Sequence, residues 1–202
     1  MARKLDPDKY EAKLQQILEA AIICFARHGF HQTSTAQICA EAGMSSGNLF
    51  HYFDSKDAII EAIVEEDRRE TAELFARIAD AEDLFAGLLE LVETSLALAM
   101  DPIYARIGME IAAEAMRNPR IARVFARSES ELKANLVALL HKAAERRQID
   151  SQLDLEQAAT WIIALADGAV GRAALDPSFK AVDHGPILRT LVTRFLRPHQ
   201  PE

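Results

Sequence analysis

Residues 33–53 read TSTAQICAEAGMSSGNLFHYF, and this stretch decides the fold. Hydroxyl residues at 33–35 offer N-cap oxygens to a helix of about two turns. Gly43 closes that helix, because glycine readily takes the left-handed backbone conformation found just past helix ends. Ser45 then caps a further short helix. The pattern predicts two short helices joined by a tight turn that contains glycine.

Each of these two helices has an inward and an outward face. The apolar residues at helical spacing predict the inward face: Ile38, Cys39, Ala42, Leu49 and Phe53. Small or hydrogen-bonding residues remain outside: Ser45, Ser46, Gly47, Asn48, His51 and Tyr52. Two short helices in this arrangement set the second helix into the major groove of DNA, and such an outward surface suits the groove. We therefore expect a helix-turn-helix.

The flanking sequence predicts further helices and no strand. An amphipathic helix from Tyr10 to Ala26 ends near Gly29, and a long helix without Gly or Pro runs from Lys56 to about Ala79. Capping signals and apolar periodicity predict five more helices at residues 81–100, 102–117, 119–148, 154–174 and 186–196. The expected fold is all-α with about nine helices. It divides into a helix-turn-helix domain at 1–55 and a helical ligand-binding and dimerisation domain at 56–202.

Charge is distributed unevenly along the chain. The formal net charge of −8 argues at first against a nucleic-acid partner, because phosphate binding draws on lysine and arginine. Up to Asp57, however, six basic residues nearly balance seven acidic ones, so most of the negative charge lies in the remainder. The N-terminal segment therefore remains compatible with DNA.

Composition also restricts the compartment. We expect a cytoplasmic protein that spans no membrane, because we expect no apolar stretch to reach the roughly 20 residues that a span needs and no signal-peptide core is visible. Cys24 and Cys39 lie among apolar neighbours and form no CxxC motif. They are expected to fill core space, with a redox switch as the alternative.

The stretch resembles the TetR/AcrR family of regulators, whose motif has the form AxxAGxSxGxLYxxFxSKxxL. The matching residues are Ala42, Gly43, Ser45, Gly47, Leu49, Phe50, Phe53, Ser55, Lys56 and, approximately, Ile59, while Cys39 stands at the position of the first alanine. The preceding IxxAAxxxFxxxGF pattern at 17–30 matches as well. Phe50 replaces the usual tyrosine, so one hydroxyl-to-phosphate contact is expected to be missing. Arg3 and Lys4 would compensate along the backbone.

The resemblance implies roles for the outward residues. Ser34, Thr35 and Gln37 would face phosphates or base edges, and Asn48 and His51 are our choices for reading bases. Tyr52 and Lys56 would contact phosphates, the lysine without selecting sequence. The alternatives are a merely solvated His51, a surface Lys56 and a Gln37 without a DNA contact.

The resemblance also implies a second domain that dimerises and encloses an effector. Residues 155–173 are apolar on more than one face, and 187–196 continue with similar spacing, so these two helices, the eighth and ninth, are expected to form a homodimer interface. Two copies would read a palindromic operator, and a small-molecule effector would release the repressor through a pivot of the long helix. Candidate effector contacts, with ordinary core or surface as the alternative, are Ser95, Tyr104, Ile107, Glu110, Phe125, Ser128 and Trp161.

Two other classes of function compete with this interpretation. A helical enzyme is disfavoured, because the six histidines show no ExxH or HxxxH spacing and no nucleophile elbow or phosphate loop is present. No catalytic residue, metal or cofactor is therefore expected. A partner-binding module that lost its DNA contact is the other alternative, suggested by the acidic balance. Asp167, an isolated acid in an apolar run, is expected to be held by Arg172 or by backbone groups.

Overall fold

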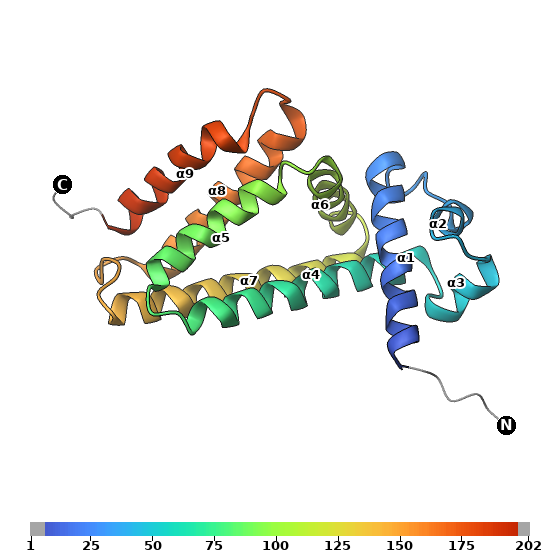
Figure 1. Ribbon diagram of the computed structural model, residues 1–202, viewed down its shortest axis with the longest axis horizontal. Helices are drawn as coiled ribbons and strands as arrows, with labels where there is room; N and C mark the ends of the chain where they lie inside the picture. Colours follow the sequence, from blue (N-terminus) through green and yellow to red (C-terminus); the bar gives the residue numbers. More distant parts are fainter. Residues whose placement is uncertain (1–6, 198–202) are drawn as a thin grey trace. The chain divides into compact units, whose positions relative to one another are not determined.

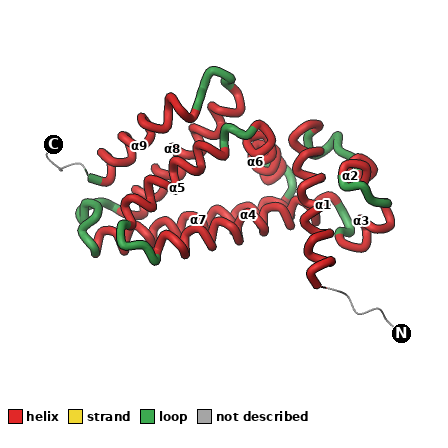
Figure 2. Tube along the Cα trace, viewed as in Figure 1, coloured by secondary structure: helices red, strands yellow, loops and turns green. Residues whose placement is uncertain are grey.

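The computed structural model describes residues 7–197, and every regular element in that range is an α-helix (Figures 1 and 2). The nine helices described there are α1 (Pro7–His28), α2 (Thr35–Glu41), α3 (Ser46–Tyr52), α4 (Lys56–Ala79), α5 (Leu84–Leu98), α6 (Pro102–Ala115), α7 (Pro119–Glu145), α8 (Leu155–Leu175) and α9 (Ala181–Leu196). The predicted all-α fold is confirmed, and α4 has the expected bounds. Arg3 and Lys4 lie outside the described residues.

Some helix ends differ from the expectation. Helix α5 begins three residues later than predicted, because the Asp83 carboxylate accepts the Ala86 amide hydrogen at 2.9 Å and caps the helix there. Helix α9 begins five residues before Pro186, which therefore lies inside the helix. No side chain caps the helix at Lys180, so no local signal marked its start.

The chain divides into two compact units. The first comprises residues up to Glu66 together with Arg106–Phe125, and the second comprises Asp67–Ala105 and the chain from Ala126 onward. The division therefore falls within α4, α6 and α7, and most of α6 belongs with the helix-turn-helix.

The first unit has its own core. Large side chains from α1, α2, α3, α4 and α7 are fully buried: Ile17, Phe25, Ile38, Leu49, Ile59, Ile60 and Ile121. Cys24 and Cys39 are also buried there as free thiols, in agreement with their expected role as core residues. This core holds α2 and α3 against α1.

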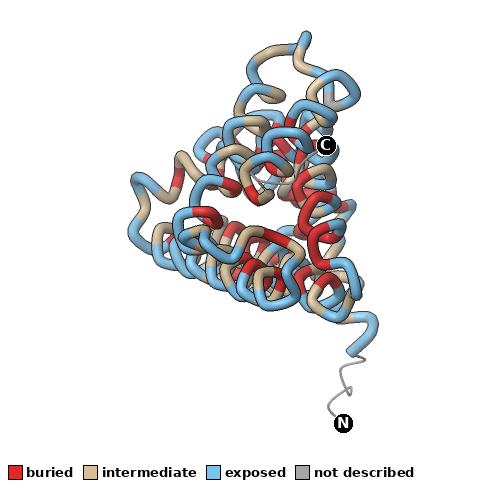
Figure 3. The backbone as a smooth tube through the Cα atoms, turned by 90° about the vertical axis from the view of Figure 1, so that its left-hand side faces the viewer, coloured by how far each residue is buried: buried red, intermediate tan, exposed pale blue. Residues whose placement is uncertain are grey.

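The second unit is built around α5, which packs against both α8 and α9. Its core includes Leu84, Leu88, Leu136, Leu140 and Leu196. Buried residues follow the helix faces that meet other helices, while the remaining faces are exposed (Figure 3).

Helix α8 corrects one expectation from the sequence. By length and composition Leu155–Leu175 is apolar enough to cross a membrane, although no such stretch was expected. Only 17% of its most apolar window is buried within the chain. Bulky apolar side chains such as Trp161 and Leu175 are exposed on it, and this exposed apolar face needs an explanation.

Candidate nucleic-acid interface

The turn between α2 and α3 is fixed by backbone geometry. Gly43 has a φ of +59°, which L side chains rarely adopt, and the Met44 amide donates to the Cys39 carbonyl at 2.9 Å. Ser45 then caps α3, because its hydroxyl accepts the Asn48 amide hydrogen at 3.4 Å. The predicted glycine turn is therefore present, and it sets the direction of α3.

The two faces of the helix-turn-helix are as the sequence predicted. All five inward residues are buried: Ile38, Cys39, Ala42, Leu49 and Phe53. The outward residues Ser45, Ser46, Gly47, Asn48 and His51 are exposed. Phe50 is also exposed, at 52%, so it adds an apolar ring to this outward surface.

Tyr52, predicted to contact a phosphate, is only half exposed. Its ring lies 4.8 Å from the ring of Tyr10 on α1, and the His51 ring meets it edge-on at 5.3 Å. The packing fixes the Tyr52 ring at the edge of the outward surface. Its phosphate contact remains a prediction.

The N-terminus of α2 forms a capping box. The Ser34 amide donates to Gln37 Oε1 at 2.8 Å, and the Gln37 amide donates to Ser34 Oγ at 3.2 Å. The side-chain oxygen of Gln37 is thus occupied within the protein, which favours a structural role for this residue. Ser34 is exposed and Thr35 half-buried, so both remain candidates for a phosphate contact.

Lys56 has internal partners that the sequence did not suggest. Its ammonium donates to the Phe30 carbonyl at 2.7 Å and to the Thr33 carbonyl at 2.6 Å, and it lies 4.6 Å from the centre of the Phe30 ring. Burial lowers the pKa of Lys56, although the charges of Asp57 and Glu114 act in the opposite direction. The structure therefore accounts for this lysine without DNA.

The seven predicted effector contacts are not brought together in one pocket. Ile107 is buried in the core of the first unit, Phe125 packs against that core, and Glu110 Oε2 accepts the Phe30 amide hydrogen at 3.1 Å. The other four, Ser95, Tyr104, Ser128 and Trp161, belong to the second unit.

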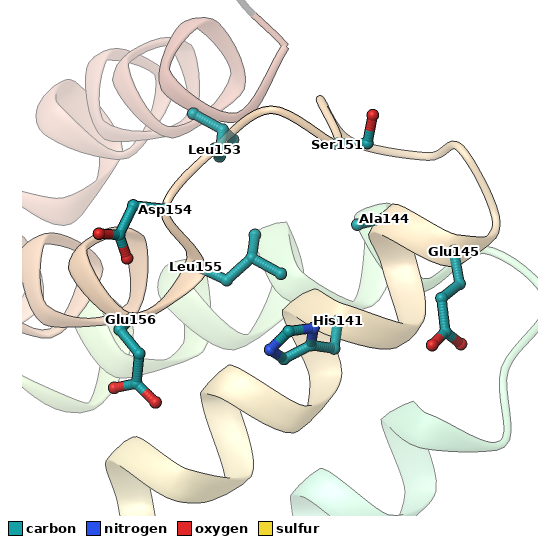
Figure 4. A pocket seen from close by; sticks show the side chains of 8 residues that line it. All are labelled: His141, Ala144, Glu145, Ser151, Leu153, Asp154, Leu155 and Glu156. Carbon is teal, nitrogen blue, oxygen red and sulfur yellow. The ribbon is translucent and has the colours of Figure 1, made fainter.

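Each unit has an open pocket among its described residues. The pocket of about 460 Å³ in the first unit is lined by Ala26, Arg27, His28, Gly29, Phe30, His31, Gln32, Arg106 and Glu110. The pocket of about 480 Å³ between the end of α7 and the start of α8 is lined by His141, Ala144, Glu145, Ser151, Leu153, Asp154, Leu155 and Glu156 (Figure 4). Of the seven predicted contacts, only Glu110 lines either pocket. Among the described residues no group of three His, Cys, Asp or Glu side chains is suited to hold a metal.

Acidic side chains with perturbed pKa values gather in the second unit. Burial raises the pKa of Asp67, and the charge of Glu70 adds to the effect. Burial and the charges of Asp167 and Asp67 raise the pKa of Glu129. The Tyr104 pKa is raised by burial and by Asp67 and Glu70. The sequence had singled out only Tyr104 and Asp167.

Arg172, one of the two kinds of partner expected for Asp167, does not pair with it. Arg172 instead pairs with Asp176 one turn further on, at 3.2 Å. Burial raises the pKa of Asp167, as expected for a carboxyl group without a cationic partner.

The buried face, the exposed face and the glycine turn together define a helix-turn-helix DNA-binding protein. The family described as "Bacterial regulatory proteins, tetR family" matches residues 17–63, and the family described as "BetI-type transcriptional repressor, C-terminal" matches residues 84–197. The chain therefore belongs to the TetR family of transcriptional regulators. Members of this family bind operator DNA and small-molecule effectors and act as dimers.

Individual relatives agree with this family. The chain is 27% identical over 171 residues to the HTH-type transcriptional repressor Rv1474c of Mycobacterium tuberculosis, covering 85% of this chain and 87% of that protein. The structure of Salmonella enterica GusR is similar with a TM-score of 0.76 and 34% identity, over 92% of this chain and 95% of GusR. The Bacillus subtilis regulator FadR, solved in complex with stearoyl-CoA, shares the fold with a TM-score of 0.77 at 20% identity, over 88% and 96% of the two chains.

Proposed function

We propose that two copies of this chain bind a palindromic operator as a repressor and that a small-molecule effector releases them. The observation that carries the proposal is the exposed face of α3, which presents hydrogen-bonding side chains while its opposite face is fixed in the core. The chain acts by binding and catalyses no reaction, and its place is the cytoplasm. The helix-turn-helix of 1–55 contacts the DNA, and 56–202 carries dimerisation and the effector.

Specific roles follow for the outward residues. Asn48 and His51 read base edges, because both are exposed and Asn48 is able to bond an adenine edge with two hydrogen bonds. Backbone phosphates are contacted by Ser34, Thr35, Ser45, Ser46, Gly47 and Tyr52. These phosphate contacts position the protein, while the base contacts select the sequence.

The dimer forms through α8 and α9. Trp161, Ala164, Gly168 and Leu175 recur at helical spacing on α8 and are exposed. A Cβ added at Gly168 would meet no atom within 4 Å, which leaves room for a neighbouring helix.

Helix α9 adds a second exposed stripe. Ile187 is 56% exposed and Leu191, one turn later, is 49% exposed. An apolar face of this size on a DNA-binding protein is best accounted for by a second copy of the chain, as in a four-helix interface. The apolar character of α8 then reflects dimerisation and not membrane insertion.

The effector binds in the second unit, where Ser95, Tyr104 and Ser128 are the candidate contacts. Trp161, the fourth predicted contact in this unit, belongs to the exposed stripe of α8 and is assigned to the dimer interface. FadR of Bacillus subtilis shows that a protein of this fold holds a small molecule. The acidic side chains near Tyr104 make this part of the unit unfavourable for an anionic group, so an effector there would present its neutral or cationic part.

Selection of bound sites from random duplex DNA tests the proposed function. The native chain should enrich a palindrome. The Asn48→Ala variant should enrich the same palindrome with one base preference lost at symmetric positions, because a bidentate base contact contributes about 1–3 kcal/mol of discrimination. Gln152→Ala, which removes an exposed amide of the second unit, is the matched control. The proposal fails if the native chain enriches no motif.

A further inference from the structure

The loop between α1 and α2, residues 29–34, is held by side chains from two other helices. Glu110 of α6 accepts the Phe30 amide hydrogen at 3.1 Å, while Lys56 of α4 donates to the Phe30 carbonyl at 2.7 Å. Lys56 also donates to the Thr33 carbonyl at 2.6 Å. Both peptide groups of Phe30 are therefore bonded to charged side chains, and hydrogen bonds to charged groups are stronger than neutral ones.

The Phe30 side chain is anchored as firmly as its backbone. Its ring is 5% exposed, lies 5.3 Å from the Phe25 ring and has the Lys56 ammonium 4.6 Å from its centre. Gly29 has a φ of +78°, and a Cβ there would lie 3.5 Å from the Glu110 carboxylate. The loop therefore fits closely around Glu110.

A second carboxylate from α6 lies beside the same loop. Glu114 is 3% exposed, and its Oε2 lies 2.9 Å from His31 Nε2 and 3.8 Å from an Arg117 nitrogen. The imidazole is close enough to form an ion pair, yet it does not meet the geometry of a hydrogen bond. Glu114 therefore lies against the loop without a hydrogen bond to it.

The position of this loop determines where α2 begins. The Thr33 hydroxyl donates to the Gly29 carbonyl at 2.8 Å, and Ser34 caps α2 directly afterwards. The loop and the first turn of α2 are thus continuous in hydrogen bonding. Because α2 packs against α3, a displaced loop would displace the base-reading surface.

We propose that Lys56 and Glu110 are positioning residues for DNA binding, which fix the α1–α2 loop from opposite sides and so preset the direction of α2 and α3. This proposal rests on DNA binding by the chain. It assigns to Lys56 an internal role in place of a phosphate contact, and to Glu110 a role at the loop in place of an effector contact.

Salt dependence separates a positioning lysine from a phosphate contact. Each phosphate contact contributes about 0.9 to the slope of log affinity against log salt, so loss of one lysine contact per subunit would reduce the slope of a dimer by about 1.8. A positioning lysine leaves the slope unchanged. Loss of the loop contact should nevertheless weaken binding, because the loop must then be ordered during association.

The experiment measures operator affinity at several salt concentrations for the full chain and its variants. Lys56→Met keeps the apolar stem over Phe30 and removes the charge, and Glu110→Ala removes the acceptor. Each should lower affinity at least about tenfold with an unchanged slope. The double variant should lose less than the product of the two, because both residues hold the same loop.

Two variants serve as controls. Glu110→Gln keeps an oxygen acceptor for the Phe30 amide and should retain most of the affinity. Lys142→Met removes another lysine that donates to a backbone carbonyl, that of Ala79 in the second unit, and should leave operator affinity unchanged. Thermal unfolding of each variant ensures that binding is compared between folded proteins.

The proposal is overturned if Lys56→Met reduces the slope by about 1.8, if it leaves affinity unchanged, or if Lys142→Met weakens binding equally. Hydrogen exchange provides a test that is independent of DNA, since the Phe30 amide should exchange faster in Glu110→Ala than in Glu110→Gln. A native chain that binds no operator refutes the proposed function, and in that case the exchange measurement alone decides the role of Glu110.

Discussion

Removal of the exposed apolar stripe of α9 should dissociate the dimer. The double variant Ile187→Ser, Leu191→Ser replaces side chains that are 56% and 49% exposed within one chain. Complete burial of such a side chain contributes about 1.5–3 kcal/mol, and about half of each is already covered, so roughly 1 kcal/mol per side chain remains for the interface. Four such side chains in a twofold dimer contribute about 4 kcal/mol, or about a thousandfold in dimer Kd.

Sedimentation velocity over a concentration series measures this change directly. The native chain should remain a dimer at concentrations where the double variant is a monomer. The Tm of the variant should also fall, because dimerisation stabilises the folded chain by mass action. Met116→Ser removes an apolar side chain that is 83% exposed in the first unit, and this control should remain dimeric. Equal dimer Kd values for the native chain and the double variant would refute the assignment of α9 to the interface.

Three further predictions concern single positions. Phe50→Tyr should strengthen operator binding about tenfold in a filter or fluorescence assay, because a hydroxyl at this exposed site adds a hydrogen bond to a phosphate in each half-site; unchanged affinity would place the ring away from the backbone. Asp67→Asn should raise Tm at pH 8. The folded-state pKa of Asp67 is raised, so the ionised carboxylate destabilises the fold above that pKa, and the gain should vanish as the pH falls to about 4; an equal gain at both pH values would contradict this. Gly87→Ala should cost about 1–3 kcal/mol in urea unfolding, because the new Cβ would lie 2.6 Å from Ile78 Cγ2, and a neutral result would show that Ile78 moves aside freely.

Local signals were sufficient to predict most of the fold. The caps at Ser34 and Ser45, the glycine turn and the apolar spacing of Ile38 and Leu49 depend on neighbours within a few residues, so the sequence displays them directly. The start of α9 was missed because Lys180 provides no side-chain cap, so the five residues before Pro186 carried no local helix signal.

Contacts between distant residues account for what the sequence did not predict at the site. Lys56 lies 26 positions from the Phe30 carbonyl that it bonds, and Glu110 lies 80 positions from the Phe30 amide. No periodicity relates such positions, so an internal lysine was indistinguishable from a phosphate-binding one. The sequence does place Glu110 and Glu114 one turn apart on α6, so both carboxylates lie on one face of this helix. In the structure that face meets Phe30 and His31 of the α1–α2 loop.

A hydroxyl-radical footprint of the native chain on its selected palindrome tests the central claim most directly. If paired α3 helices enter successive major grooves, each strand should show protected patches about 10 base pairs apart on one face of the duplex. A single protected patch, or patches on opposite faces, would contradict the claim that two exposed α3 surfaces read one operator together.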